Sequence, residues 1–193
     1  MKKFLLSIIC CLMAFVAVQA DSVTYKVASA TSVTVSAGSA PQGSTATFKN
    51  TYTSNKEQIT KNNSMTLTLA GYAGYKITGI TLYMKSNKSA GTGSFSMVAG
   101  STTLSEIASS AFNNKNWNGA YTQTYTNVVP AMTNAEYEIG KSENVVIKIA
   151  AAVNSLYCQS FTIEYEQVGG EVLTELSNPV ISVESVMSPI KTG

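Results

Sequence analysis

The chain has 193 residues, of which 13 are basic and 11 are acidic, and it contains no histidine. All the basic residues are lysines, so arginine is absent too. These absences exclude a Ser-His-Asp or Cys-His nucleophile pair and any zinc site with histidine ligands. Without arginine there is no bidentate clamp for phosphate or guanine, so we expect no nucleic-acid partner.

Residues 1–20 have the pattern of a secretory signal peptide. Lys2 and Lys3 form a charged start, a mostly apolar run follows, and Val18-Gln19-Ala20 provides small residues for cleavage. The apolar run is too short to favour a membrane span. We therefore expect a secreted protein, extracellular or on the cell surface, with no membrane insertion after cleavage.

Two cysteines in this segment raise the alternative of a lipoprotein. Lipid attachment needs a small residue before the modified cysteine, but Ile9 precedes Cys10, and cleavage before Cys11 would leave a very short apolar run. We therefore expect a free chain that begins at Asp21. The remainder holds equal numbers of lysines and acids, so its net charge indicates no acidic partner. Its single cysteine, Cys158, allows no intrachain disulfide.

Apolar and polar residues alternate from Val23 to about residue 166, which is typical of half-buried antiparallel strands. Turn-rich segments about ten residues apart favour a sandwich or barrel. The fold prediction is an all-β sandwich of two antiparallel sheets over residues 21–168, and the resemblance given below implies a jelly-roll-like arrangement. Its core is predicted to include the apolar faces of several strands: Leu67, Leu69, Ile80, Leu82, Ile147, Ile149, Phe161 and Ile163.

Two segments depart from strict alternation. Between Tyr75 and Lys85 the apolar positions change from odd to even numbers near Gly79, which predicts a β-bulge or strand bend. From Leu104 to Phe112 the apolar residues fall on one helical face, so a short helix is predicted there.

The alternating pattern stops after Glu166. Gln167-Val168-Gly169-Gly170 is predicted to end the domain, and residues 169–178 are predicted to form a linker. Pro179 to Val183 has the composition of a strand, but residues 179–193 are too few for a domain. We expect them to be a truncated strand or a disordered tail.

Three segments have a distinctive wording: LTLAGYAGYKITGITLYMKSNKSAGTGSFSMVAGSTTL (67–104), NWNGAY (116–121) and ENVVIKIAAAVNSLYCQSFTIEYE (143–166). Together they resemble a jelly-roll β-sandwich module of secreted bacterial surface proteins. This resemblance implies fold and location, but the module carries no agreed activity. SNPVISVE (177–184) is similar to the first strand of the immunoglobulin-like repeats at the C-terminus of chitobiase-type enzymes. Residues 186–189 depart from that family's glycine-containing turn, which suggests a truncated repeat.

The segment from Asn113 to Tyr121 is the strongest candidate for a ligand site. It contains the only tryptophan of the chain, surrounded by asparagines. An aromatic platform combined with side-chain amides suits a glycan, because amides both donate and accept hydrogen bonds. The candidate ligand-binding residues are Asn114, Asn116, Trp117, Asn118 and Tyr121. Alternatively, Trp117 plugs one end of the sandwich and the asparagines form turns. An exposed Trp117 near Tyr121 or Tyr72 would favour binding.

Other candidate sites have simpler interpretations. The segments 86–93 and 53–63 are predicted to be solvated loops, the latter with Lys56, Glu57 and Lys61 in water. The carboxylate pairs Glu136/Glu138 and Glu164/Glu166 are interpreted as solvated strand charges that discourage edge pairing rather than as a glycosidase pair.

The remaining residue types indicate no further chemistry. Cys158 is interpreted as a small buried residue. Asp21 is the only aspartate, so a carboxylate-rich calcium site is not expected, although one built from backbone carbonyls stays open. No catalytic residue, metal or cofactor is predicted.

These patterns favour a secreted, non-catalytic module that binds a glycan or another surface polymer through its loops. The alternative is a structural spacer or adhesin stalk segment with no ligand of its own. An enzyme is the third possibility.

Overall fold

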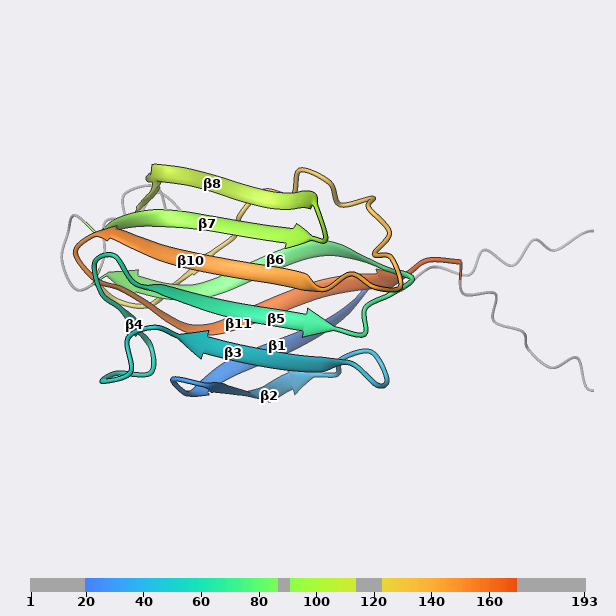
Figure 1. Cartoon of the computed structure of the whole chain (residues 1–193), viewed down its shortest axis with the longest axis horizontal. Helices are drawn as coiled ribbons and strands as arrows, with labels where there is room; N and C mark the ends of the chain where they lie inside the picture. Colours follow the sequence, from blue (N-terminus) through green and yellow to red (C-terminus); the bar gives the residue numbers. More distant parts are fainter. Residues whose placement is uncertain (1–19, 87–90, 114–122, 170–193) are drawn as a thin grey trace, which may run out of the picture.

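The computed structural model describes residues 20–86, 91–113 and 123–169, and these residues form two antiparallel β-sheets packed face to face (Figure 1). One sheet, called sheet A, contains β1 (Asp21–Ser29), β2 (Ser32–Gly38), β4 (Gln58–Ile59), β6 (Tyr75–Ser86), β9 (Thr126–Val128) and β11 (Leu156–Gln167). The other, called sheet B, contains β3 (Thr45–Asn50), β5 (Ser64–Ala70), β7 (Thr92–Ala99), β8 (Thr102–Asn113) and β10 (Val145–Val153). The predicted all-β sandwich is confirmed.

The strand order is β2-β1-β11-β6-β9 in sheet A, with β4 also paired to β11, and β3-β5-β10-β7-β8 in sheet B. From β5 onward the chain crosses repeatedly between the two sheets, because β5, β7, β8 and β10 belong to sheet B while β6, β9 and β11 belong to sheet A. Among the described residues, no helix is long and apolar enough to cross a membrane.

The core lies between the sheets and is built by period-two alternation. In β10, Val145, Ile147 and Ile149 are fully buried, whereas Lys148 between them is exposed. Each of the eight residues predicted for the core is at most 1% exposed. Burying one such side chain stabilises the fold by about 1.5–3 kcal/mol, so the alternating faces hold the sandwich together without a disulfide.

The predicted irregularity in β6 is present. Glu164 of β11 pairs with Gly79, but the next residue, Tyr165, pairs with Ile77, so β6 contains one extra residue at this point. A β-bulge of this kind shifts the alternation by one position. Ile77 and Ile80 can therefore both face the core.

The predicted helix from Leu104 to Phe112 is wrong. This segment belongs to β8 and pairs with β7, and both of its end residues are fully buried. Two register shifts interrupt the pairing, one of them next to Phe95, which lies opposite Ile107. These shifts break the period of two, and the resulting spacing of apolar residues imitated a helical face.

The described chain ends where β11 closes against the start of β6. The Val168 N–H donates to the Gly74 carbonyl at 2.8 Å, and the Tyr165 ring contacts the Tyr75 ring with 5.6 Å between centroids. Residues 1–19 of the predicted signal peptide, and the predicted linker and tail beyond Gly169, lie outside the described residues.

Candidate functional site

The five predicted ligand-binding residues, Asn114, Asn116, Trp117, Asn118 and Tyr121, lie outside the described residues, as do residues 87–90 of the second candidate loop. The strand ends that flank both segments are described, and they lie together. Asn113 pairs with Thr92 at the start of β7, and Thr126 at the start of β9 pairs with Met84 near the end of β6. Both candidate segments are therefore attached to the same end of the sandwich.

Four side chains at this end of sheet A form a compact group, called here the tyrosine–lysine cluster: Tyr83, Lys85, Tyr125 and Tyr157. The Tyr83 and Tyr125 rings are stacked, with centroids 5.2 Å apart and planes inclined by 25°. The Lys85 Nζ lies 4.6 Å from the centroid of the Tyr125 ring and 5.1 Å from that of Tyr157. Such cation–π contacts stabilise an exposed arrangement by about 0.5–1 kcal/mol each.

Strand register places these residues on the outer face. Leu82 and Met84 of β6 are buried, so the alternating Tyr83 and Lys85 face away from the core. Tyr157 of β11 lies directly opposite Lys85. Tyr125 immediately precedes β9, the strand next to β6 on its other side.

A carboxylate from the β3–β4 connection fixes the Tyr125 ring. The Tyr125 hydroxyl donates to Glu57 Oε2 at 2.6 Å, while the Glu57 carbonyl accepts from the Cys158 N–H at 2.9 Å. Burial is the largest cause that raises the pKa of Tyr125, and the hydrogen bond to the Glu57 carboxylate raises it further. The phenol therefore stays a donor well above neutral pH. Glu57 was predicted to be solvated; it is instead half-buried because it accepts this bond, whereas Lys56 and Lys61 are exposed as predicted.

The cluster presents aromatic surface to solvent. Tyr83 is 36% exposed, and Tyr125 and Tyr157 are half-buried. The exposed Tyr83 ring stacks on Tyr125, which a cation and a hydrogen bond hold in place, so little freedom is lost when a ligand covers Tyr83. The arrangement can therefore bind an apolar face of a ligand, with an ammonium group and a carboxylate beside it for polar contacts.

Tyr72, which was considered as a neighbour for an exposed Trp117, does not belong to an exposed platform. It is fully buried, and its ring contacts those of Tyr165 and Tyr75 edge to face. Its hydroxyl forms a 3.2 Å hydrogen bond with that of Tyr25. Because the buried hydroxyl has a polar partner, the ring can fill the end of the core.

The carboxylate pairs lie at the surface, as predicted. Glu136 is bound to Lys76, and this hydrogen bond is the main cause of a raised pKa for the lysine. Glu138 and Glu164 are exposed and Glu166 is half-buried.

Cys158 is fully buried, as predicted, and burial raises the pKa of its thiol. A thiol in this environment is a poor nucleophile. Within the described ranges, no group of three or more histidine, cysteine, aspartate or glutamate residues could hold a metal ion.

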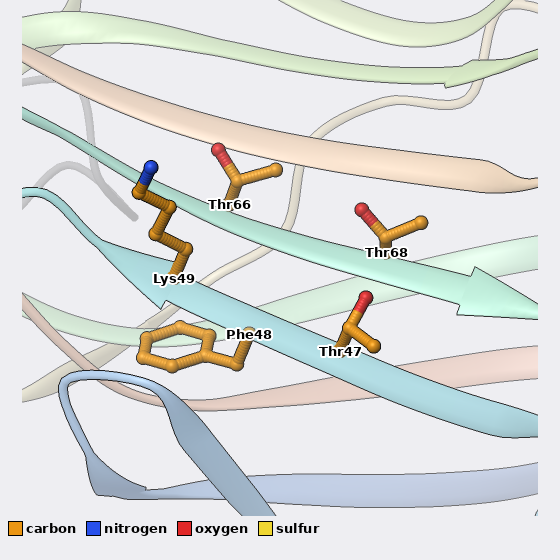
Figure 2. A pocket seen from close by; sticks show the side chains of 5 residues that line it. All are labelled: Thr47, Phe48, Lys49, Thr66 and Thr68. Carbon is orange, nitrogen blue, oxygen red and sulfur yellow. The ribbon is translucent and has the colours of Figure 1, made fainter.

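A second surface feature lies on the outer face of sheet B. A hollow of about 260 Å³ is lined by residues of β3 and β5: Thr47, Phe48, Lys49, Thr66 and Thr68. Figure 2 shows the three threonines and Lys49 on one side of these strands, with the Phe48 ring on the other. The hydroxyl residues of β5 were predicted to alternate with its core residues, but nothing in the pattern indicated a hollow.

The sequence contained a signal for part of the tyrosine–lysine cluster. Once Leu82 and Met84 are assigned to the core, Tyr83 and Lys85 must face outward. Tyr125 gave no such signal, because it lies in a segment without periodicity, and its contact with Glu57 joins residues 68 positions apart.

No protein-family model matches the chain, and a comparison with curated proteins finds no match.

Proposed function

We propose that this protein is a secreted, non-catalytic module that binds a glycan at the end of the sandwich that carries the tyrosine–lysine cluster. The observation that carries the proposal is the stacked pair of Tyr83 and Tyr125, with Tyr83 36% exposed on the outer face of sheet A. The candidate loop residues Asn114, Asn116, Trp117, Asn118 and Tyr121 are part of the same proposed site.

The chemistry of the cluster fits a sugar ring. A pyranose presents C–H groups on its faces, which pack on the electron-rich face of an aromatic ring. Its hydroxyl groups need partners that donate and accept hydrogen bonds, and Lys85 and Glu57 provide one of each type beside the rings. A small aromatic area with a few placed polar groups is the usual composition of a ligand site.

The position of the cluster supports a joint site with the predicted loop. Tyr125 follows residue 122 by three positions, and Lys85 precedes residue 87 by two. Both candidate loops therefore begin or end within a few residues of the stacked rings.

The alternative of a structural spacer also has an observation in its favour. The Tyr125 hydroxyl, its ring face and the Lys85 ammonium all have partners within the chain, so the cluster stabilises this end of sheet A even without a ligand. A glycan-binding module needs the exposed ring of Tyr83 for contact with the ligand, whereas a spacer needs it only for the stack with Tyr125.

A glycan array with the purified protein tests the proposal. We expect binding to a defined group of glycans, a loss of at least tenfold in affinity for Tyr83→Ala, and a smaller loss for Tyr83→Phe, which keeps the ring. Val35→Ala serves as the matched control, because Val35 is 53% exposed on β2 at the opposite edge of the same sheet. A folded protein that binds no glycan, or equal losses for Tyr83→Ala and Val35→Ala, would favour the spacer.

A further inference from the structure

Sheet B has an outer face whose charges have one sign over four neighbouring strands. The strands β3, β5, β10 and β7 contain only two charged residues, Lys49 and Lys148. Both are exposed, and both lie opposite Thr66, one on each side of it. Since neighbouring strands are about 4.8 Å apart, the two lysine backbones are roughly 10 Å apart, with Thr66 between them.

The hollow in Figure 2 lies at this position. Its outward side is formed by Thr47 and Thr68, which are paired to each other, and by Lys49 and Thr66, which form the next pair. In the part of the chain that the structure describes, the side chains of these four residues and of Lys148 make no hydrogen bond or ion pair with one another or with other side chains. Their donors and acceptors are open to a ligand.

One carboxylate shares this outer face: the exposed Glu106, on the edge strand β8. Along the same row of paired residues, Lys148 is followed by Ser96 of β7 and then by Glu106 of β8, the first acid within the sheet. The strands of sheet A, in contrast, carry both signs of charge: Asp21, Glu164 and Glu166 together with Lys26, Lys76 and Lys85. The equal numbers of lysines and acids in residues 21–193 gave no indication that Lys49 and Lys148 share one face, because the register of the strands decides where the charges gather.

We propose that this face of sheet B binds an anionic polysaccharide, with a sulfate or carboxylate group between Lys49 and Lys148 above Thr66. Each ammonium group donates charge-assisted hydrogen bonds to such a group. The threonine hydroxyls donate to and accept from sugar hydroxyls on either side. This site is on the opposite sheet from the tyrosine–lysine cluster and recognises a charge rather than an apolar ring face, so it does not depend on the function proposed above.

A polysaccharide fits this face better than an anionic membrane does. Surfaces that bind anionic lipids typically gather roughly four to eight basic residues, and this face has two. Of the large apolar residues that are exposed in the described ranges, only Val153, at the end of β10, belongs to sheet B. A face rich in hydroxyls with paired cations is suited to a hydrated, charged sugar chain.

Binding of the purified protein to dextran sulfate and to polygalacturonate, with neutral dextran as the uncharged reference, tests this proposal by calorimetry. We expect binding to at least one of the two anionic polymers and none to dextran, with an affinity that falls as salt is raised. The double variant K49Q/K148Q should lose at least tenfold in affinity. The control K26Q/K141Q removes the same charge from exposed lysines on β1 and in the turn before β10, and it should stay within twofold of the unchanged protein.

Several results would overturn the proposal. Equal binding to dextran and to both anionic polymers, or no binding to any of them, would do so without any variant. Equal losses for the two double variants would mean that only net charge matters. Binding to vesicles rich in phosphatidylserine but to neither anionic polymer would assign the face to a membrane instead. If K49Q/K148Q did not fold, the single variants K49Q and K148Q would replace it, each with a loss of at least threefold expected.

Discussion

The outer faces of the two sheets are built on the same pattern of alternation but have different chemistry. The strands of sheet A contain both signs of charge and several tyrosines, and at one end these side chains contact each other: Tyr83 stacks on Tyr125, and Lys85 lies over both Tyr125 and Tyr157. The central strands of sheet B present threonines, serines and two lysines that have no such partners within the described chain.

This difference shows that the packing of the core does not determine the chemistry of the outer faces. Both sheets bury mostly aliphatic and aromatic residues on their inner faces, with Tyr25 and Tyr165 in sheet A and Phe95 and Phe112 in sheet B. The outward positions are free to vary, and each sheet uses them differently. Sheet A has a face that is already ordered by internal contacts, whereas the face of sheet B leaves its polar groups to water or a ligand.

The largest losses of stability are expected in the core, which the two sheets share. Ile147→Ala in sheet B and Phe161→Ala in sheet A should each lower the free energy of unfolding by about 2–5 kcal/mol, because both side chains are fully buried in the shared core. Urea unfolding measures the loss. If both variants lost less than about 0.5 kcal/mol, the range of surface substitutions, the inner and outer faces would have been assigned the wrong way round.

A moderate effect is expected at the ordered face of sheet A. Tyr125→Phe removes the hydrogen bond to Glu57 and should cost about 0.5–1.5 kcal/mol near neutral pH, as measured by urea unfolding. A loss as small as that of an outward threonine, such as Thr34→Ala on β2, would mean that the cluster is not held by Glu57.

The raised pKa of Tyr125 also predicts that the stability of the fold depends on pH. Because the pKa of Tyr125 is raised above its ordinary value of 10.0, the folded state holds the phenol proton more tightly than the unfolded state. Its contribution to stability is therefore complete below pH 10 and is lost as the pH rises further. Unfolding measured from pH 8 to 11 should show a decline above pH 10 that is smaller in Tyr125→Phe. An equal decline in both proteins would contradict this assignment.

A small effect is expected at the open face of sheet B. K49Q/K148Q should change the free energy of unfolding by less than about 0.5 kcal/mol, because neither ammonium has a partner in the described chain. Thermal and urea unfolding check this. A loss of more than 1 kcal/mol would mean that the lysines stabilise sheet B and would remove the contrast between the two faces.

The smallest effect is expected from the end of the chain. Deleting residues 171–193 should leave the melting temperature nearly unchanged, because β11 already closes against β6 through the bond from Val168 to Gly74. Differential scanning calorimetry compares the two lengths. A decrease of several degrees would place part of the tail in the sheet and move the predicted domain boundary beyond residue 168.

Much of the fold could be predicted because each strand carries its own signal. The alternation in β10 and β11 identified Ile147, Ile149, Phe161 and Ile163 as core residues, and the change of parity near Gly79 located the bulge. The core positions and the bulge can be read from residues that are close together in the sequence. The β8 strand was missed because its register shifts against β7 are set by a partner strand.

The candidate site was less predictable for the same reason. Tyr83 and Lys85 follow from the alternation of β6, but the stack with Tyr125 and the bond to Glu57 join distant segments. Tyr72 was considered only as a neighbour that would favour binding if it lay beside an exposed Trp117. Its burial depends on the Tyr25 hydroxyl from another strand, which the sequence around Tyr72 cannot indicate.

The most direct test of the proposed glycan site is an NMR titration with the strongest binder from the array, following the aromatic resonances of the tyrosines and the amides of β3 and β5. If a neutral glycan binds at the tyrosine–lysine cluster, the ring signals of Tyr83 and Tyr125 should shift progressively as the site fills. The amides of Thr47, Lys49 and Thr66 on sheet B should stay in place. Saturating shifts confined to sheet B or to the β1–β2 edge, with the rings of Tyr83 and Tyr125 unchanged, would contradict the account.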